Sequence, residues 1–165
     1  YGDEIGMRYV EGLKSVEGGY NRTGSRSPMQ WDDSTNAGFS SAPASDLYIA
    51  MDPDKDRPTA KKEMAAPDSL YHEVKKLIRI RQSHKALQSR GKITFVYAEK
   101  NAYPLAYIRE DGDEKILVII NAAAEAKTFA CDAEPKEAIY NFGAAAEAKN
   151  GKITVPAQSA GFYRI

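Results

Sequence analysis

One short run constrains the fold of this chain more than any other feature: Ile116–Ile120 is apolar at every position. A strand with one face in water alternates apolar and polar residues, so an uninterrupted apolar run indicates a strand that is covered on both faces. Four of its five residues are β-branched, which also favours a strand. The run therefore predicts a central strand in a layered β domain.

Other strand-like runs surround this one. Runs rich in β-branched and aromatic residues lie at 93–97, 103–109, 127–131, 138–142, 152–155 and 161–165. The dipeptides Asp111-Gly112, Asn150-Gly151 and Pro156-Ala157 are typical of turns and separate several of them. Roughly six or seven short strands punctuated by turns are typical of an antiparallel sandwich. We therefore predict such a sandwich over residues 91–165.

Residues 67–90 carry the single clear helical pattern. Pro67-Asp68-Ser69 supplies a helix start with Asp68 or Ser69 as the cap, and the helix should end between Ser83 and Gln88. Four apolar residues share one face at helical spacing: Leu70, Val74, Leu77 and Ile78. The amphipathic helix and the strands together predict an α+β chain that is mainly β. An exposed stripe of this kind is rarely left in water, so we expect either the first fifty residues or a homodimer to cover it.

Residues 1–66 show no sustained periodicity, because glycine and proline interrupt them too often for long helices or strands. So long an irregular stretch argues against a compact domain that stands by itself. We therefore divide the chain into segments 1–66, 67–90 and 91–165. Because the chain opens on Tyr1 rather than Met, we expect it to be a piece of a longer protein.

Two stretches begin like metal-binding motifs and then depart from them. Counted from Asp52 as an EF-hand loop, Glu63 falls at the twelfth place, but Arg57 stands where the sixth place needs glycine. His72-Glu73 opens like the zinc motif H-E-x-x-H, but Lys76 stands in place of the second imidazole. We therefore expect no metal site and no cofactor, and a solvated acidic turn at 52–56.

Composition excludes some partners. The 23 Lys and Arg residues balance the 23 Asp and Glu residues, so no net field steers the chain to nucleic acid or to an anionic membrane. No apolar run approaches membrane-spanning length, and no signal peptide is recognisable. The single cysteine, Cys131, excludes an internal disulfide and favours a reducing compartment, so we expect a cytoplasmic location. A neutral partner such as a sugar fits this balance.

Three motifs in the first forty residues resemble a known family. Tyr1–Met7 reads YGDEIGM, Arg26–Asp32 reads RSPMQWD and Asn36–Ser40 reads NAGFS. Together they resemble the end of the catalytic barrel in glycoside hydrolase family 13, the α-amylase superfamily, and especially its α-glucosidase, oligo-1,6-glucosidase and trehalose-synthase-like branch. The resemblance implies that residues 1–66 are loops left over after the eighth strand of a (β/α)8 barrel, that 67–90 is the last barrel helix, and that 91–165 is a C-terminal Greek-key sandwich.

The resemblance also implies a chemistry, which is retaining cleavage or transfer of α-glucosidic bonds by an Asp nucleophile and a Glu acid/base. In the family these carboxylates, and an Asn-His-Asp motif that this sequence lacks, come from earlier barrel strands. We therefore assign no catalytic residue, expect the chain alone to be inactive, and expect an oligosaccharide substrate to be held mainly by the missing barrel. The family motif implies a substrate-lining role for Arg26. Trp31 is a candidate for stacking on a sugar face, with a packing anchor in the loop as the alternative.

A second hypothesis is a non-catalytic carbohydrate-binding or structural β-sandwich module that works alone. Binding modules of that kind display aromatic residues on an exposed face, whereas the tyrosines here stand mostly at alternating strand positions typical of a core. A purely structural module would leave the first forty residues unexplained. The sequence leaves open the linkage and length of the substrate, and the choice among hydrolysis, transglycosylation and isomerisation.

Overall fold

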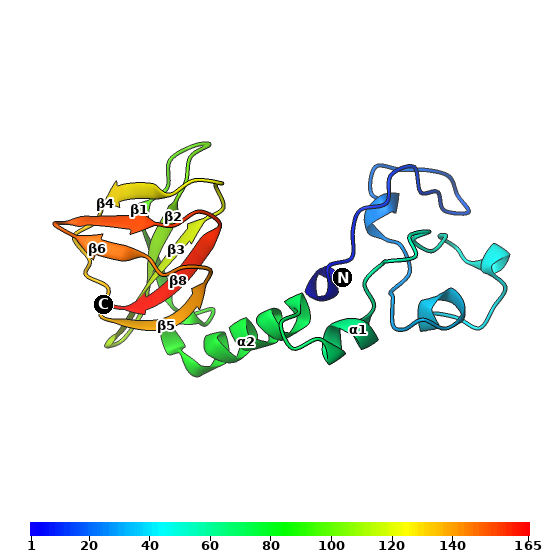
Figure 1. Ribbon diagram of the computed structural model, residues 1–165, viewed down its shortest axis with the longest axis horizontal. Helices are drawn as coiled ribbons and strands as arrows, with labels where there is room; N and C mark the ends of the chain where they lie inside the picture. The colour runs from blue at the N-terminus through cyan, green and yellow to red at the C-terminus, as the bar shows by residue number, and fades with distance from the viewer. The chain divides into compact units, whose positions relative to one another are not determined.

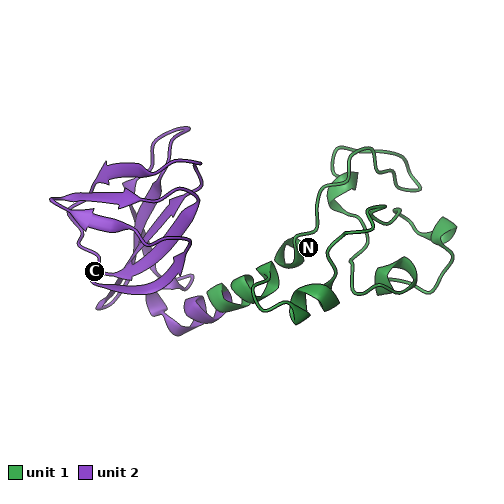
Figure 2. Ribbon diagram, in the orientation of Figure 1, with its two compact units in different colours: residues 1–77 green, residues 78–165 purple.

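The computed structural model describes residues 1–165 and is built mainly from antiparallel strands with few helices (Figure 1). This confirms the prediction of a mainly β chain with a helix before the strands. The chain divides into two compact units, Tyr1–Leu77 and Ile78–Ile165 (Figure 2). The division falls within α2, Leu70–Ser83, and each unit is described below by itself.

The second unit contains two antiparallel sheets. The larger has the strand order β1-β2-β3-β8-β5 and the smaller the order β4-β7-β6. The strands of the first sheet are β1 Lys92–Tyr97, β2 Leu105–Asp111, β3 Glu114–Asn121, β8 Ser159–Arg164 and β5 Glu137–Phe142. Those of the second are β4 Lys127–Ala130, β7 Lys152–Val155 and β6 Glu147–Lys149. The predicted turn at Asp111-Gly112 joins β2 to β3, and Gly112 takes a φ of 62°, which glycine adopts without strain.

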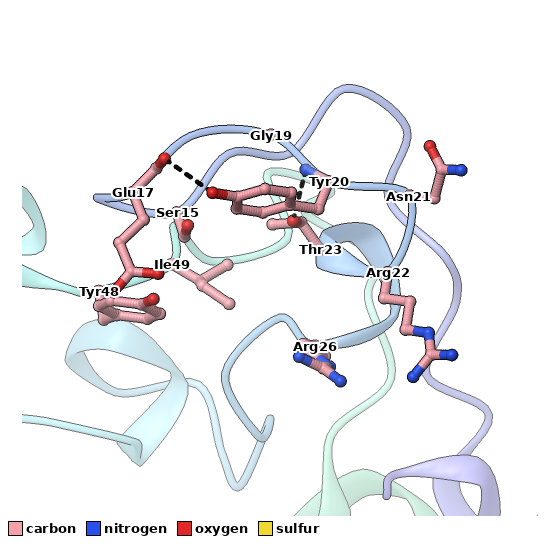
Figure 3. A pocket seen from close by; sticks show the side chains of 10 residues that line it. All are labelled: Ser15, Glu17, Gly19, Tyr20, Asn21, Arg22, Thr23, Arg26, Tyr48 and Ile49. Atoms are coloured by element: carbon pink, nitrogen blue, oxygen red, sulfur yellow. Dashed lines mark hydrogen bonds between the residues drawn. The ribbon is translucent and has the colours of Figure 1, made fainter.

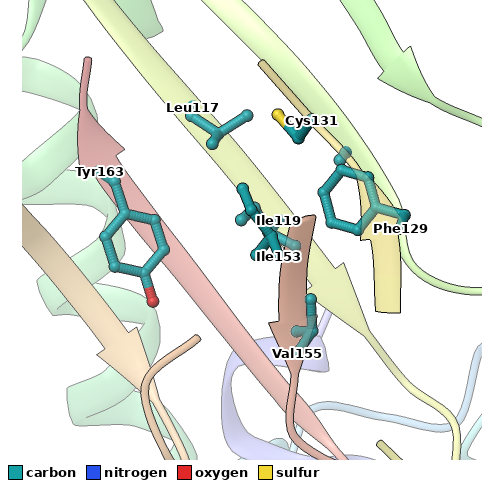
Figure 4. Packing of buried hydrophobic residues seen from close by; sticks show 8 residues of the cluster. Leu117, Ile119, Phe129, Cys131, Ile153, Val155 and Tyr163 are labelled. Carbon is teal, nitrogen blue, oxygen red and sulfur yellow. The ribbon is translucent and has the colours of Figure 1, made fainter. Parts of the chain in front are cut away.

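Strand β3 lies at the centre of the larger sheet, as its sequence predicts. Its residues 116–119 are at most 1% exposed, so both of its faces are covered. Leu117 and Ile119 pack into one cluster with residues of the smaller sheet, namely Phe129, Ile153 and Val155 (Figure 4). Ile116 and Val118 pack on the opposite face against the short helix η5, Lys85–Leu87. The core of this unit is therefore the space between the two sheets, with a second cluster behind β3.

A buried amide ties the two sheets together where β3 ends. Asn121 is 1% exposed, and its Nδ2 lies 2.9 Å from the carbonyl oxygen of Glu125, 3.1 Å from that of Val155 and 2.8 Å from that of Pro156. Its Oδ1 accepts a hydrogen bond from the N–H of Ala123 at 3.1 Å. Because buried polar groups are costly without partners, this network fixes the connections from β3 and from β7.

The first unit is built from turns and short helices. Four 3-10 turns (η1 Asp3–Ile5, η2 Thr23–Ser25, η3 Thr35–Gly38 and η4 Ala44–Asp46) precede α1, Ala60–Ala65. Thr59 caps α1, because its side chain accepts a hydrogen bond from the N–H of Lys62. The predicted helix is confirmed as α2, where Leu70 and Ile78 are 46% and 52% exposed. Coverage of its stripe by a second copy stays a prediction.

The acidic segment at 52–56 differs from the solvated turn that we expected. Asp52 is 1% exposed, and Arg8 binds its carboxylate through two hydrogen bonds of 2.9 and 2.7 Å. A third contact joins Arg8 to Asp54 at 2.8 Å. Desolvation of Asp52 opposes its ionisation, but the Arg8 hydrogen bonds and the N–H of Asp54 outweigh it and lower the pKa of Asp52. Arg8 therefore holds the segment at 52–56 in place through Asp52 and Asp54, and the expectation of a solvated turn was wrong for Asp52.

Candidate functional site

A hollow of about 720 Å³ opens beside Arg26 within the first unit. Its lining comes from two segments, the loop that leads into the RSPMQWD motif and a short extended piece at Tyr48 and Ile49 (Figure 3). The remaining lining residues are Ser15, Glu17, Gly19, Tyr20, Asn21, Arg22 and Thr23. Its volume lies in the range of small-molecule sites.

Local hydrogen bonds shape the loop that forms this hollow. Ser15 and Gly18 exchange backbone hydrogen bonds of 2.8 and 3.0 Å, which close a tight turn. The N–H of Val16 donates to the carbonyl of Tyr48 at 2.9 Å and so brings the second segment alongside. Gly24 lets the loop pass close to the backbone at Val10, because a Cβ on Gly24 would lie 2.4 Å from the Val10 carbonyl oxygen.

One end of the hollow is aromatic and acidic. Tyr20 and Tyr48 are 64% and 55% exposed, so their rings are open to a ligand. The Tyr20 hydroxyl donates to the carbonyl oxygen of Glu17 at 3.4 Å, and Figure 3 shows it pointing toward that residue. The nearby Glu17 carboxylate raises the pKa of Tyr48. Glu17 therefore adds a negative charge to this end.

The other end is basic. Arg22 and Arg26 lie before and after η2 and are both exposed. The Tyr1 hydroxyl fixes the backbone here, because it lies 3.2 Å from the carbonyl oxygen of Arg26 and 2.5 Å from that of Ser27. No ion pair or side-chain hydrogen bond in residues 1–165 occupies either guanidinium group. Both groups are therefore available to hydrogen-bond a ligand.

Trp31 lies outside the lining of this hollow. Trp31 is 52% exposed, while its backbone N–H donates to the Ala37 carbonyl at 2.8 Å and its backbone carbonyl accepts from the N–H of Lys61 at 2.9 Å. Asn36 and Ala37 have φ angles of 50° and 53°, in a region that residues other than glycine seldom adopt. Backbone strain of this kind is found most often at functional sites. The two site residues predicted from the family motif thus stand on one well-fixed segment but do not share one hollow.

Sequence reasoning missed the other residues of the hollow. Glu17, Tyr20, Arg22 and Tyr48 were not among the predicted site residues, although Tyr20-Asn21-Arg22 places an aromatic ring, an amide and a cation just before the motif. That grouping was the available signal. Nowhere do three or more His, Cys, Asp or Glu side chains gather as they would around a metal ion. No helix is long and apolar enough to cross a bilayer.

The fold and this motif define the class of the protein. The family described as "Alpha amylase, catalytic domain" matches residues 1–90, which is more than half of the chain. The chain belongs to this family, and the resemblance seen in its sequence is confirmed.

Particular relatives are similar to this chain over most of its length. It is 30% identical over 135 residues to the glucan 1,6-alpha-glucosidase of Streptococcus pneumoniae serotype 4, covering 82% of this chain and 24% of the relative. It is 34% identical over 108 residues to the oligo-1,6-glucosidase of Parageobacillus thermoglucosidasius, covering 66% of this chain and 18% of the relative. The crystal structure of the trehalulose synthase MutB from Pseudomonas mesoacidophila MX-45 matches with a TM-score of 0.72 and 30% identity, covering 87% of this chain and 26% of that one. The chain thus spans about a quarter or less of the length of these proteins.

Proposed function

We propose that this chain belongs to a retaining α-glucosidase-type glycoside hydrolase that acts on α-glucosides in carbohydrate metabolism. In this proposal the chain supplies loops beside the sugar pocket and a stabilising β domain, while the catalytic Asp and Glu come from other parts of the enzyme. One observation carries the proposal: the family match covers residues 1–90 and therefore includes the RSPMQWD motif and the hollow beside it. The printed names of two relatives, a glucan 1,6-alpha-glucosidase and an oligo-1,6-glucosidase, favour the same class of substrate.

Within this proposal, residues 1–66 are the loops that follow the eighth strand of a (β/α)8 barrel, 67–90 is the last barrel helix and 91–165 is a Greek-key sandwich. The end of the family match at residue 90, just before β1 begins, supports this division. The scarcity of buried hydrophobic residues in the first unit, where only Ile5 and Ala37 are buried, also supports it. Loops that lean on a larger body need few core residues of their own.

Arg26 and Trp31 are the residues that we assign to the substrate. The Arg26 guanidinium can donate to sugar hydroxyls or to a neighbouring carboxylate, and its lack of a partner in this chain supports that role. The half-exposed Trp31 ring can stack on the apolar face of a sugar. A cytoplasmic location forms part of the proposal and is supported by the free, buried Cys131.

The test asks whether the chain binds an α-glucoside without cleaving it. We expect maltose to shift the amide resonances of Thr23 and Arg26 in a 15N-labelled chain, and to leave those of the hairpin at Gly112 unmoved. In parallel, maltose, isomaltose, trehalose and a nitrophenyl α-glucoside should show no turnover. Cleavage that persists at constant specific activity through a further purification step would contradict the placement of the catalytic carboxylates. Absence of any maltose-dependent shift near Arg26 would contradict the pocket-side role.

A further inference from the structure

The two ends of the hollow beside Arg26 carry opposite charges, which a neutral sugar would leave uncompensated. Arg22 and Arg26 stand four residues apart at the basic end with no acidic partner, whereas Arg8 and Arg164 each pair with carboxylates. Glu17 carries the charge at the other end, where it lines the hollow beside Tyr48 (Figure 3). Within residues 1–165, no carboxylate therefore supplies a counter-charge to the basic end.

Guanidinium groups match oxyanions in both charge and shape. The planar fork of arginine donates two parallel hydrogen bonds to a carboxylate or a phosphate, and such charge-assisted bonds are about twice as strong as neutral ones. A sugar hydroxyl offers neither the charge nor the paired acceptors. Two unpaired arginines at one end of a hollow of about 720 Å³ consequently favour a ligand with an anionic group.

The opposite end suits a sugar ring and would orient such a ligand. The Tyr20 and Tyr48 rings offer apolar faces against which the C–H groups of a pyranose can pack. The Glu17 carboxylate can accept hydroxyl groups, and its charge repels an anion from this end. Ring and anion are thereby assigned to different ends of the same hollow (Figure 3).

We propose that this hollow selects a glycoside that bears a phosphate or carboxylate group, with the anion between Arg22 and Arg26 and the sugar ring beside Tyr20 and Tyr48. The inference rests on the proposed function for the sugar, and it adds the anionic group as the feature that sets the substrate class. Arg22 is then a specificity-determining residue, because it contributes to binding only when the ligand is charged.

The experiment titrates the 15N-labelled full chain with glucose, glucose 6-phosphate, glucuronate and inorganic phosphate. We expect glucose 6-phosphate and glucuronate to bind about tenfold more tightly than glucose, and glucose 6-phosphate to bind more tightly than inorganic phosphate. Raising the salt concentration should weaken binding of the charged sugars and leave glucose unaffected. The phosphate and carboxylate arms tell which anion the site prefers, and a gain with either one supports the inference.

Matched variants separate the outcomes. Arg22→Gln removes one of the two arginines and should weaken binding of glucose 6-phosphate severalfold, more than it weakens binding of glucose. Arg90→Gln, at an exposed arginine of the second unit, should change neither. If glucose binds and the charged sugars bind no more tightly, the inference fails and the proposed function stands. If no sugar binds, the inference fails together with the pocket-side role of this chain. If inorganic phosphate binds as tightly as glucose 6-phosphate, the basic end is a site for an adventitious ion only, and the inference fails.

Discussion

The two units of this chain bury different kinds of residue. The second unit contains nearly all of the buried hydrophobic side chains, arranged on both faces of β3, and buries only Asn121 and Ser159 among polar residues. The first unit buries mainly polar residues: Thr23, Ser27, Gln30, Asp52 and Thr59. One unit is thus organised by a hydrophobic core. The other is organised by hydrogen bonds and one ion-pair cluster, except at Gln30, whose buried side-chain amide has no hydrogen-bond partner.

This difference indicates which part of the isolated chain is the more stable. The free energy gained by burying apolar surface is non-directional and roughly proportional to the area buried. A sheet with covered faces therefore stays folded through many contacts. Polar interactions are directional, and each contributes only about 1 kcal/mol net. We therefore expect the second unit to be the stable part of the isolated chain, while the first unit, with its hollow and its strained turn at Asn36 and Ala37, opens more easily.

The largest expected effect comes from the core of the second unit. Ile119→Ala removes a fully buried side chain between the two sheets and should lower the free energy of unfolding by about 2–5 kcal/mol, through lost burial and the cavity that remains. Ile93→Ala is the matched control, because Ile93 is 48% exposed on the edge strand β1 of the same sheet and should cost under about 1 kcal/mol. Urea unfolding followed by far-UV circular dichroism measures both, and equal costs would mean that β3 is not the centre of stability.

A smaller loss is expected from the ion-pair cluster of the first unit. Arg8→Gln leaves the buried carboxylate of Asp52 without its two hydrogen bonds and should destabilise this unit, by less than for a fully buried pair because Arg8 is half exposed. Trp31 is the only tryptophan and lies in this unit, so its fluorescence reports the loss. Arg22→Gln, which breaks no pair, should leave the transition unchanged. An unaltered fluorescence transition in Arg8→Gln would show that the ion-pair cluster does not stabilise the first unit.

The smallest effect is a dependence on pH in the second unit. Desolvation of Glu114 opposes its ionisation, but hydrogen bonds from the N–H of Ala86 and from His84, at 2.9 and 2.6 Å, together with the Arg164 charge, lower the pKa of Glu114 below its ordinary value. A lowered folded-state pKa gives stability that is complete above the unfolded-state value, near 4.3, and is lost as pH falls through the folded-state pKa. Glu114→Gln should therefore flatten the fall in the free energy of unfolding between about pH 5 and pH 3, by roughly 1 kcal/mol, as measured by urea unfolding.

Glu125→Gln is the control for that comparison. Lys127 also lowers the pKa of Glu125, but this pair lies on the surface, where solvent screens it. We expect no change in the slope of stability against pH for Glu125→Gln. A slope that falls equally in both variants would show that general charge, rather than the hydrogen bonds of Glu114, sets the pH dependence.

Parts of the fold could be predicted from sequence because their signals are local. The apolar run of β3, the turn at Gly112 and the cap at Thr59 each follow from backbone and solvation preferences of a few residues. The burial of Asp52 could not be predicted, because it depends on an ion pair with Arg8. Arg8 lies 44 positions earlier in the chain, and no periodic pattern links the two residues. Pairing of the strands into two sheets likewise depends on contacts that are distant in sequence.

The candidate site divides in the same way. Arg26 and Trp31 could be predicted because they stand in a contiguous motif, and the structure places only Arg26 in the lining of the hollow. Their contact with a substrate stays a prediction. Tyr48 could not be found, because it reaches the hollow through a backbone hydrogen bond from Val16, which no pattern in the sequence encodes. Arg22 was not predicted, because the sequence around a cation in a glycine-rich loop does not distinguish a binding residue from an ordinary solvated one.

One measurement tests the contrast between the two units most directly. Urea unfolding of the unaltered chain can be followed at once by Trp31 fluorescence, which reports the first unit, and by the far-UV circular dichroism of the strands, which lie in the second. We expect two transitions, with fluorescence changing at a clearly lower urea concentration than circular dichroism. Two superimposable curves would contradict it, since they would show that both units unfold as one cooperative body.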